Sequence, residues 1–99
     1  MTNGLLILNE SGIFTFTGPT VKADGKYMPS APHLVHVAAT AHFEGITGPY
    51  NITGYVGDGG IHLEFVGRPG VGKGFIVAGP VALPNTAIRG AANVILRLE

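Results

Sequence analysis

The side chains best suited to chemistry are four histidines, His33, His36, His42 and His62. An imidazole can bind a metal or transfer a proton, and Glu64 follows His62 at the spacing that puts both on one strand face. Within one strand, His33 and His36 would point to opposite faces, and His36 and His42 would lie roughly 20 Å apart. A metal site would therefore need ligands from several strands, and His62 with Glu64 is the best candidate for an acid–base pair.

A glycine-rich segment at residues 67–74, Gly-Arg-Pro-Gly-Val-Gly-Lys-Gly, matches the spacing of a phosphate-binding loop. The position after Lys73 is Gly74, where such loops carry the Ser or Thr that holds magnesium. Residues 75–80 are an apolar run ended by Gly-Pro, which predicts a strand and not the helix whose N-terminus would bind phosphate. We interpret the segment as a hairpin loop.

Composition narrows the possible classes of function. The absence of Cys excludes disulfides, thiol catalysis and thiolate metal sites. Six basic and six acidic side chains give a net charge of zero without a basic stripe, so nucleic acid is not an expected partner. Only 12% of residues are charged while 45% are apolar, against roughly 25% charged in a typical domain. Some apolar surface should therefore contact another copy or partner, and the sequence predicts self-association.

The start of the sequence carries no targeting signal. Residues 1–4 lack the basic start of a secretory signal, and the apolar run at residues 4–8 is too short for one. Gly and Pro interrupt every long apolar stretch, so we predict no transmembrane helix and no membrane partner. We expect a soluble protein that is cytoplasmic by default, unless it uses another export route or a leader outside this sequence.

The elements that would position these side chains are strands, because no segment keeps apolar residues at helical spacing over ten or more positions. Apolar and polar residues instead alternate along residues 33–43, 50–56 and 61–66. The predicted apolar face of the first strand comprises Val35, Val37, Ala39, Ala41 and Phe43. In the other two strands, the apolar face comprises Tyr50, Ile52, Val56, Ile61, Leu63 and Phe65.

Turn residues predict how these three strands connect. Gly-Asp-Gly-Gly at residues 57–60 predicts a hairpin that pairs Val56 with Ile61. The Gly and Pro residues within 44–49 predict a second hairpin, which pairs Phe43 with Tyr50. The three apolar faces then coincide on one side of a meander.

The polar face of this meander is the predicted site. Its register places Tyr55 beside His62, Thr53 between Thr40 and Glu64, and Asn51 beside His42. A solvated face is the simplest interpretation; a ligand-contacting face and a metal or catalytic site are the alternatives. In a closed barrel, the polar face could also turn inward and line a cavity. The candidate ligand-binding residues are His42, Tyr55, His62 and Glu64, and no catalytic residue, metal ligand or cofactor is predicted.

The rest of the chain also reads as strands, at residues 5–9, 13–17, 75–78 and 92–98. A hairpin is expected around residues 9–12, and a long irregular loop at residues 21–32 with its turn at Asp24-Gly25. Pro80 and Pro84 make residues 78–85 a candidate sheet edge. Six to eight short strands predict an all-β fold, a small antiparallel barrel or sandwich, in one domain over residues 1–99.

Three blocks of the sequence resemble an uncharacterised family of small all-β bacterial proteins. They are Gly-Leu-Leu-Ile-Leu-Asn at residues 4–9, the strand at residues 33–43, and Gly-Pro-Val-Ala-Leu-Pro-Asn at residues 79–85. The resemblance implies a bacterial origin and a compact β fold. The family offers no catalytic residue to carry over.

Three functions fit these features. The first is a non-catalytic binding or assembly module, homo-oligomeric, in which an edge such as residues 78–85 pairs across subunits. The second is a small-molecule site, binding or enzymatic, inside a barrel or at its mouth and built from the four candidate residues. The third is a membrane-active oligomer that inserts an amphipathic hairpin spanning residues 35–56.

Overall fold

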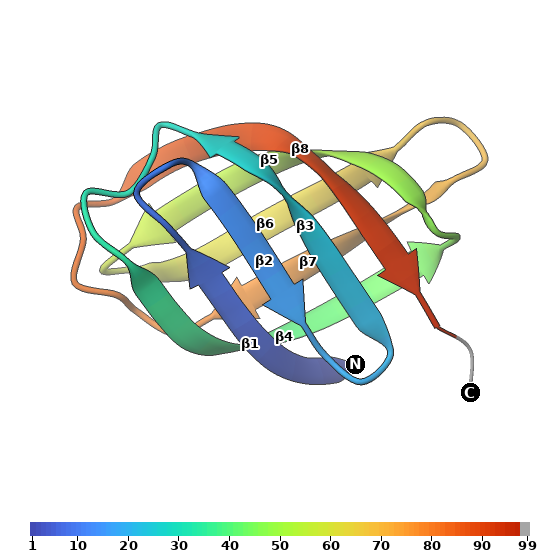
Figure 1. Ribbon diagram of the computed structural model, residues 1–99, viewed down its shortest axis with the longest axis horizontal. Coiled ribbons are helices and arrows are strands. Elements are labelled where there is room, and N and C mark those ends of the chain that lie inside the picture. Colours follow the sequence, from blue (N-terminus) through green and yellow to red (C-terminus); the bar gives the residue numbers. More distant parts are fainter. Residues whose placement is uncertain (98–99) are drawn as a thin grey trace.

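The computed structural model describes residues 1–97, which form eight antiparallel strands closed into a barrel (Figure 1). The strands are β1 (Thr2–Leu8), β2 (Ile13–Thr17), β3 (Val21–Met28), β4 (Val35–Gly45), β5 (Gly48–Gly57), β6 (Gly60–Gly67), β7 (Gly72–Ala78) and β8 (Thr86–Leu96). The predicted all-β class is confirmed, and of the two architectures expected it is the barrel. No helix in residues 1–97 is long and apolar enough to cross a membrane.

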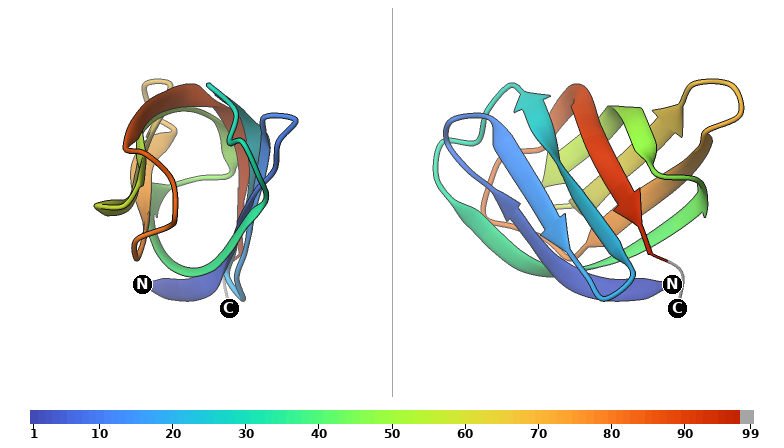
Figure 2. Two further views of the ribbon diagram at one scale, coloured as in Figure 1. Left: turned by 90° about the vertical axis from the view of Figure 1, so that its left-hand side faces the viewer. Right: turned by 45° about the vertical axis from the view of Figure 1, so that its right-hand side comes forward.

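The barrel closes through strands that are distant in the sequence. Around it the order is β1-β2-β3-β8-β5-β6-β7-β4, so β8 lies between β3 and β5, and β4 joins β7 back to β1 (Figure 2). Each strand therefore has a partner on both sides, and the expected free edge at residues 78–85 is wrong. Ala78 ends β7 and pairs with both Ala39 and Ile61, while residues 79–85 connect β7 to β8.

Strands β4 and β5 do not pair with each other. Phe43 on β4 lies opposite Gly74 on β7, and β5 pairs with β6 and β8. The predicted hairpin at residues 44–49, the three-stranded meander and the amphipathic hairpin over residues 35–56 are therefore wrong. The physical reason is closure, because β1 and β7 occupy both sides of β4. Phe43 and Tyr50 still meet, but inside the barrel, with ring centroids 5.8 Å apart.

The segment expected as a long loop is mostly strand β3. Asp24 does not form a turn but pairs with Thr15 on β2 and Asn93 on β8. Alternation is present here but weak, since the inward positions include Ala23 and Gly25 and no large aliphatic residue beyond Val21. The hairpin around residues 9–12 is confirmed by the pairing of β1 with β2. The strand expected at residues 92–98 is the second half of β8, which ends at Leu96. Leu98 lies outside the described residues.

The predicted apolar faces of β4, β5 and β6 are confirmed, because they all point into the barrel. The interior is filled by side chains from all eight strands, and no polar or charged residue is buried in the described part of the chain. Phe65 is at the centre of an aromatic cluster, with ring centroids 6.2 Å from Phe14 and 5.1 Å from Phe43. The interior is therefore a packed core, as small barrels require.

Glycine occupies inward positions where a neighbouring strand comes too close for a side chain. A Cβ at Gly90 of β8 would overlap the backbone carbonyl oxygen of Lys26 on β3. A Cβ at Gly54 of β5 would overlap the carbonyl oxygen of His62 on β6 in the same way. Such glycines mark sharp bends at which a sheet turns a barrel corner.

Two tyrosines close the opposite ends of the core. The Tyr27 hydroxyl donates to the Asn9 carbonyl at 2.7 Å and accepts from the Ala31 N–H at 3.1 Å. At the other end, the Tyr50 hydroxyl donates to the Ile46 carbonyl at 2.7 Å. Burial raises the pKa of both phenols above 10.0; at Tyr27 the Ala31 hydrogen bond opposes this and Glu10 adds to it.

These raised pKa values predict a loss of stability in alkali. Above pH 10.0 the unfolded chain releases the two phenolic protons while the folded protein retains them, so the unfolded state binds fewer protons. The stabilisation is thus complete below pH 10.0 and is lost as pH rises through the folded-state pKa values. We expect the free energy of unfolding, measured in urea, to fall more steeply with alkaline pH than in a Tyr27→Phe/Tyr50→Phe variant. Equal slopes in the two proteins would contradict this.

Candidate functional site

The four predicted site residues lie on the outside of the barrel, on neighbouring strands. Tyr55 on β5 pairs with His62 on β6, and Thr53 pairs with Glu64, which confirms the register predicted for this hairpin. His42 on β4 lies two strands away from His62 on β6, because β7 lies between β6 and β4. The prediction that Asn51 lies beside His42 is wrong, since β4 and β5 do not pair. For the same reason Thr40 is not beside Thr53, whose second partner is Arg89.

The residue that connects the two halves of the site is Phe75 on β7. It pairs with Glu64 on one side and with His42 on the other. The sequence did not identify Phe75 because it starts the uninterrupted apolar run at residues 75–78, in which alternation cannot say which side chains point outward. The only available signal is Lys73, a charged residue two positions earlier on the same strand face.

Four rings from four adjacent strands form one row on the outer surface, which we call the aromatic row: Tyr55, His62, Phe75 and His42. Ring centroids are 6.1 Å apart between Tyr55 and His62, 6.4 Å between His62 and Phe75, and 5.7 Å between Phe75 and His42. The His62 and Phe75 planes differ by only 8°. Tyr55 is 53% exposed and Phe75 is half-buried, so the row is open to solvent along its length.

Each histidine of the row has a glutamate partner on its own strand. His62 Nε2 lies 2.7 Å from Glu64 Oε1, and His42 Nε2 lies 3.4 Å from Glu44 Oε1. The two pairs flank Phe75, one on β6 and the other on β4. Each carboxylate orients an imidazole and thereby fixes the position of its ring in the row.

This face presents exposed rings and carboxylates on an open surface, and not in an enclosed pocket. The outer surface of a barrel is convex, and the side chains of His62 and Glu64 are 38% and 55% exposed. Enzyme sites are usually concave and exclude water from the reacting groups, and nothing excludes water from this pair. No group of three or more metal-ligating side chains occurs within residues 1–97. The alternative in which the polar face turns inward and lines a cavity is wrong, because these side chains face solvent.

The glycine-rich segment at residues 67–74 forms the end of β6, a loop and the start of β7. A strand follows the loop, as predicted, and β7 pairs with β6 from residue 73 onward. Lys73 stands on the outer face, between Val66 on β6 and Glu44 on β4. The phosphate-binding geometry of a loop followed by a helix is therefore not formed here.

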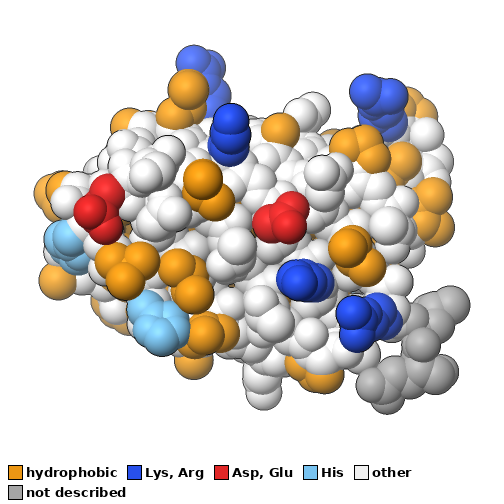
Figure 3. All heavy atoms as spheres, viewed as in Figure 1, with side chains coloured by type: hydrophobic (Ala, Val, Ile, Leu, Met, Phe, Trp, Pro, Cys, Tyr) orange, Lys and Arg blue, Asp and Glu red, His pale blue; other side chains and the backbone are white. Residues whose placement is uncertain are grey.

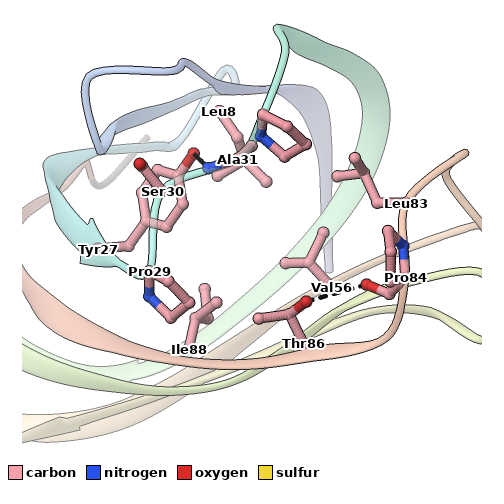
Figure 4. Close-up of a pocket in the computed structure, with 11 residues that line it drawn as sticks. Leu8, Tyr27, Pro29, Ser30, Ala31, Val56, Leu83, Pro84, Thr86 and Ile88 are labelled. Atoms are coloured by element: carbon pink, nitrogen blue, oxygen red, sulfur yellow. Dashed lines mark hydrogen bonds between the residues drawn. The ribbon is translucent and has the colours of Figure 1, made fainter.

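One end of the barrel contains a small cavity between two proline-rich connections (Figure 4). Its volume is about 40 Å³, and its walls include Leu8, Val56, Leu83 and Ile88 with the Tyr27 ring at one side. Pockets for drug-sized ligands typically measure about 300–1,000 Å³. The cavity has room for water-sized molecules or a small apolar group, so it does not offer the interior ligand site that the sequence left open.

Comparisons with family models, with curated proteins and with solved structures find no match to this chain. The resemblance to a family of small all-β bacterial proteins stays a prediction.

Proposed function

We propose that this protein is a non-catalytic binding module that self-associates through the outer face of β4, β5, β6 and β7. The observation that supports the proposal is the aromatic row, which places four rings at the surface on adjacent strands. Aromatic side chains bury much area at low entropic cost and are enriched where proteins meet. Val66, which is 57% exposed, extends the apolar area of this face on β6.

The closed fold supports association through side chains. Every strand has a hydrogen-bonded partner on both sides, so no described strand can be extended by pairing with another chain. The core is filled, and the convex face suits a broad protein surface better than a small molecule. The low fraction of charged residues, 12% of the sequence, also supports self-association through an apolar surface.

The proposal predicts that removing the rings gives a monomer. We expect the wild-type protein to show a concentration-dependent mass above that of one chain by sedimentation velocity. A Tyr55→Ser/Phe75→Ser variant should sediment as a monomer over the same range, because the shared apolar area is lost.

Leu5→Ser serves as the matched control, since Leu5 is an exposed apolar residue of β1, a strand outside β4 to β7 that pairs with neither β3 nor β8. It should sediment like the wild type, and circular dichroism should show that both variants remain folded. A wild-type protein that is strictly monomeric at high concentration would rule out the proposal.

A further inference from the structure

The zero net charge conceals a segregation of charge around the barrel. Four exposed cations lie on β3, on β8 and immediately after β8, and we call them the basic strip: Lys22, Lys26, Arg89 and Arg97. Asp24 is the one carboxylate on these two strands. Figure 3 views the side of the barrel that carries β3 and β8, where several Lys and Arg side chains lie among hydrophobic and other side chains, and Asp or Glu side chains are also visible.

The cations of the basic strip have no carboxylate partner within the described residues. The two ion pairs of residues 1–97 are the His–Glu pairs beside the aromatic row, and neither involves a lysine or an arginine. Even Asp24, which lies on the same strand face as Lys22 and Lys26, forms no ion pair with them. The strip is therefore available to carboxylates of another molecule.

Carboxylates predominate on the opposite side of the barrel. In the order of eight strands, β7 is four places from β3 and β4 is four places from β8, so these strands face each other across the core. Glu44 and Glu64 flank the aromatic row on that side, and Lys73, the cross-strand partner of Glu44, is the one lysine or arginine on β4 to β7. The strands of this side thus carry two carboxylates and one lysine, whereas the basic strip has four cations beside one carboxylate.

We infer that the aromatic row of one copy binds the basic strip of a second copy, an inference that rests on the proposed function. Glu44 and Glu64 would meet Lys26 and Arg89, and opposite charges at facing positions favour encounter and fix register. Two aromatic rows facing each other would instead bring like carboxylates together, which is unfavourable. The basic strip also offers apolar contact area, because Met28 and Ile95 are exposed beside its cations.

The position of the two faces determines the kind of assembly. A face that binds a different face of the next copy is a heterologous contact, which generates a ring if the rotation closes and an open filament if it does not. Because β3 and β8 lie across the core from β7 and β4, each copy that joins leaves one face of each kind free. We expect a series of sizes that grows with protein concentration, and not a two-fold dimer.

Two charge-reversal variants test the inference in the full chain. In Glu44→Lys/Glu64→Lys, the aromatic-row face repels the basic strip of another copy, while the variant's own basic strip is unchanged. In Lys26→Glu/Arg89→Glu, the basic strip repels the aromatic-row face of another copy, while the variant's own aromatic row is unchanged. Each variant alone should associate at least about tenfold more weakly than the wild type in sedimentation velocity. An equimolar mixture of the two should associate again, because each supplies the face that the other has lost.

Arg68→Glu is the matched control, since it reverses a cation in the β6–β7 loop outside both faces and should leave association unchanged. If Lys26→Glu/Arg89→Glu alone associates like the wild type, the heterologous contact is overturned while self-association through the aromatic row stands. A mixture that stays monomeric also overturns it. A wild-type protein that never associates removes the proposed function itself. Circular dichroism of each variant separates loss of contact from loss of fold.

Discussion

A Gly90→Ala protein should be less stable than the wild type by at least about 2–3 kcal/mol, or should fail to fold. The added methyl group would overlap the carbonyl oxygen of Lys26, which belongs to the backbone of β3 and cannot rotate away. The overlap can be removed only if β3 and β8 move apart, and this movement weakens the hydrogen bonding between the two strands. Chemical denaturation followed by circular dichroism measures the change.

Gly79→Ala is the matched control for this substitution. A Cβ at Gly79 would meet no atom within 4 Å, and its φ is not positive. Its stability should change by about 0.5 kcal/mol or less, or rise slightly because alanine restricts the unfolded chain. Equal stabilities of the two variants would show that the close approach of β3 to β8 is not a constraint on the fold.

Phe65→Ala should cost about 3–5 kcal/mol, because a fully buried ring at the centre of the core is replaced by a cavity. Phe14 and Phe43 would each lose an edge-to-face contact, and neither strand can move inward without breaking its ladder. Since a domain of this kind is typically stable by about 5–15 kcal/mol, the variant should lie near the limit of folding.

Val66→Ala, one residue further along β6, is the control for the loss at Phe65. Val66 points outward and is 57% exposed, so its replacement should change the free energy of unfolding by about 1 kcal/mol or less. The midpoint of unfolding in guanidinium chloride compares the two variants directly. A similar loss in both would mean that the interior is loosely packed.

The sequence predicted which side chains face the core but not which strands become neighbours. Alternation is a local property, so the inward positions of Val35, Ile52 and Leu63 could be identified from single segments. Pairing depends on closure of the whole barrel, which places β7 beside β4 and β8 beside β5. The Gly and Pro residues at 44–49 have the composition of a hairpin turn, and yet they join strands that do not pair.

In the candidate site, too, the sequence predicted the local strand pairing but not the neighbours that come from distant strands. The hairpin of β5 and β6 has a short glycine-rich turn that sets its register, and so Tyr55 and His62 could be placed side by side. His42 could be placed on the correct strand face, but its neighbour Phe75 is 33 residues further along the chain, and no single turn sets the register between their strands. The charge segregation between β3–β8 and β4–β7 likewise needs the order of strands around the barrel.

The position of β8 between β3 and β5 also bears on when the chain can fold during its synthesis. Until residues 86–96 leave the ribosome, β3 and β5 each lack one partner, and the nascent chain exposes two open sheet edges. Nascent chains stalled before β8 should therefore depend more on chaperones than chains in which β8 has been released.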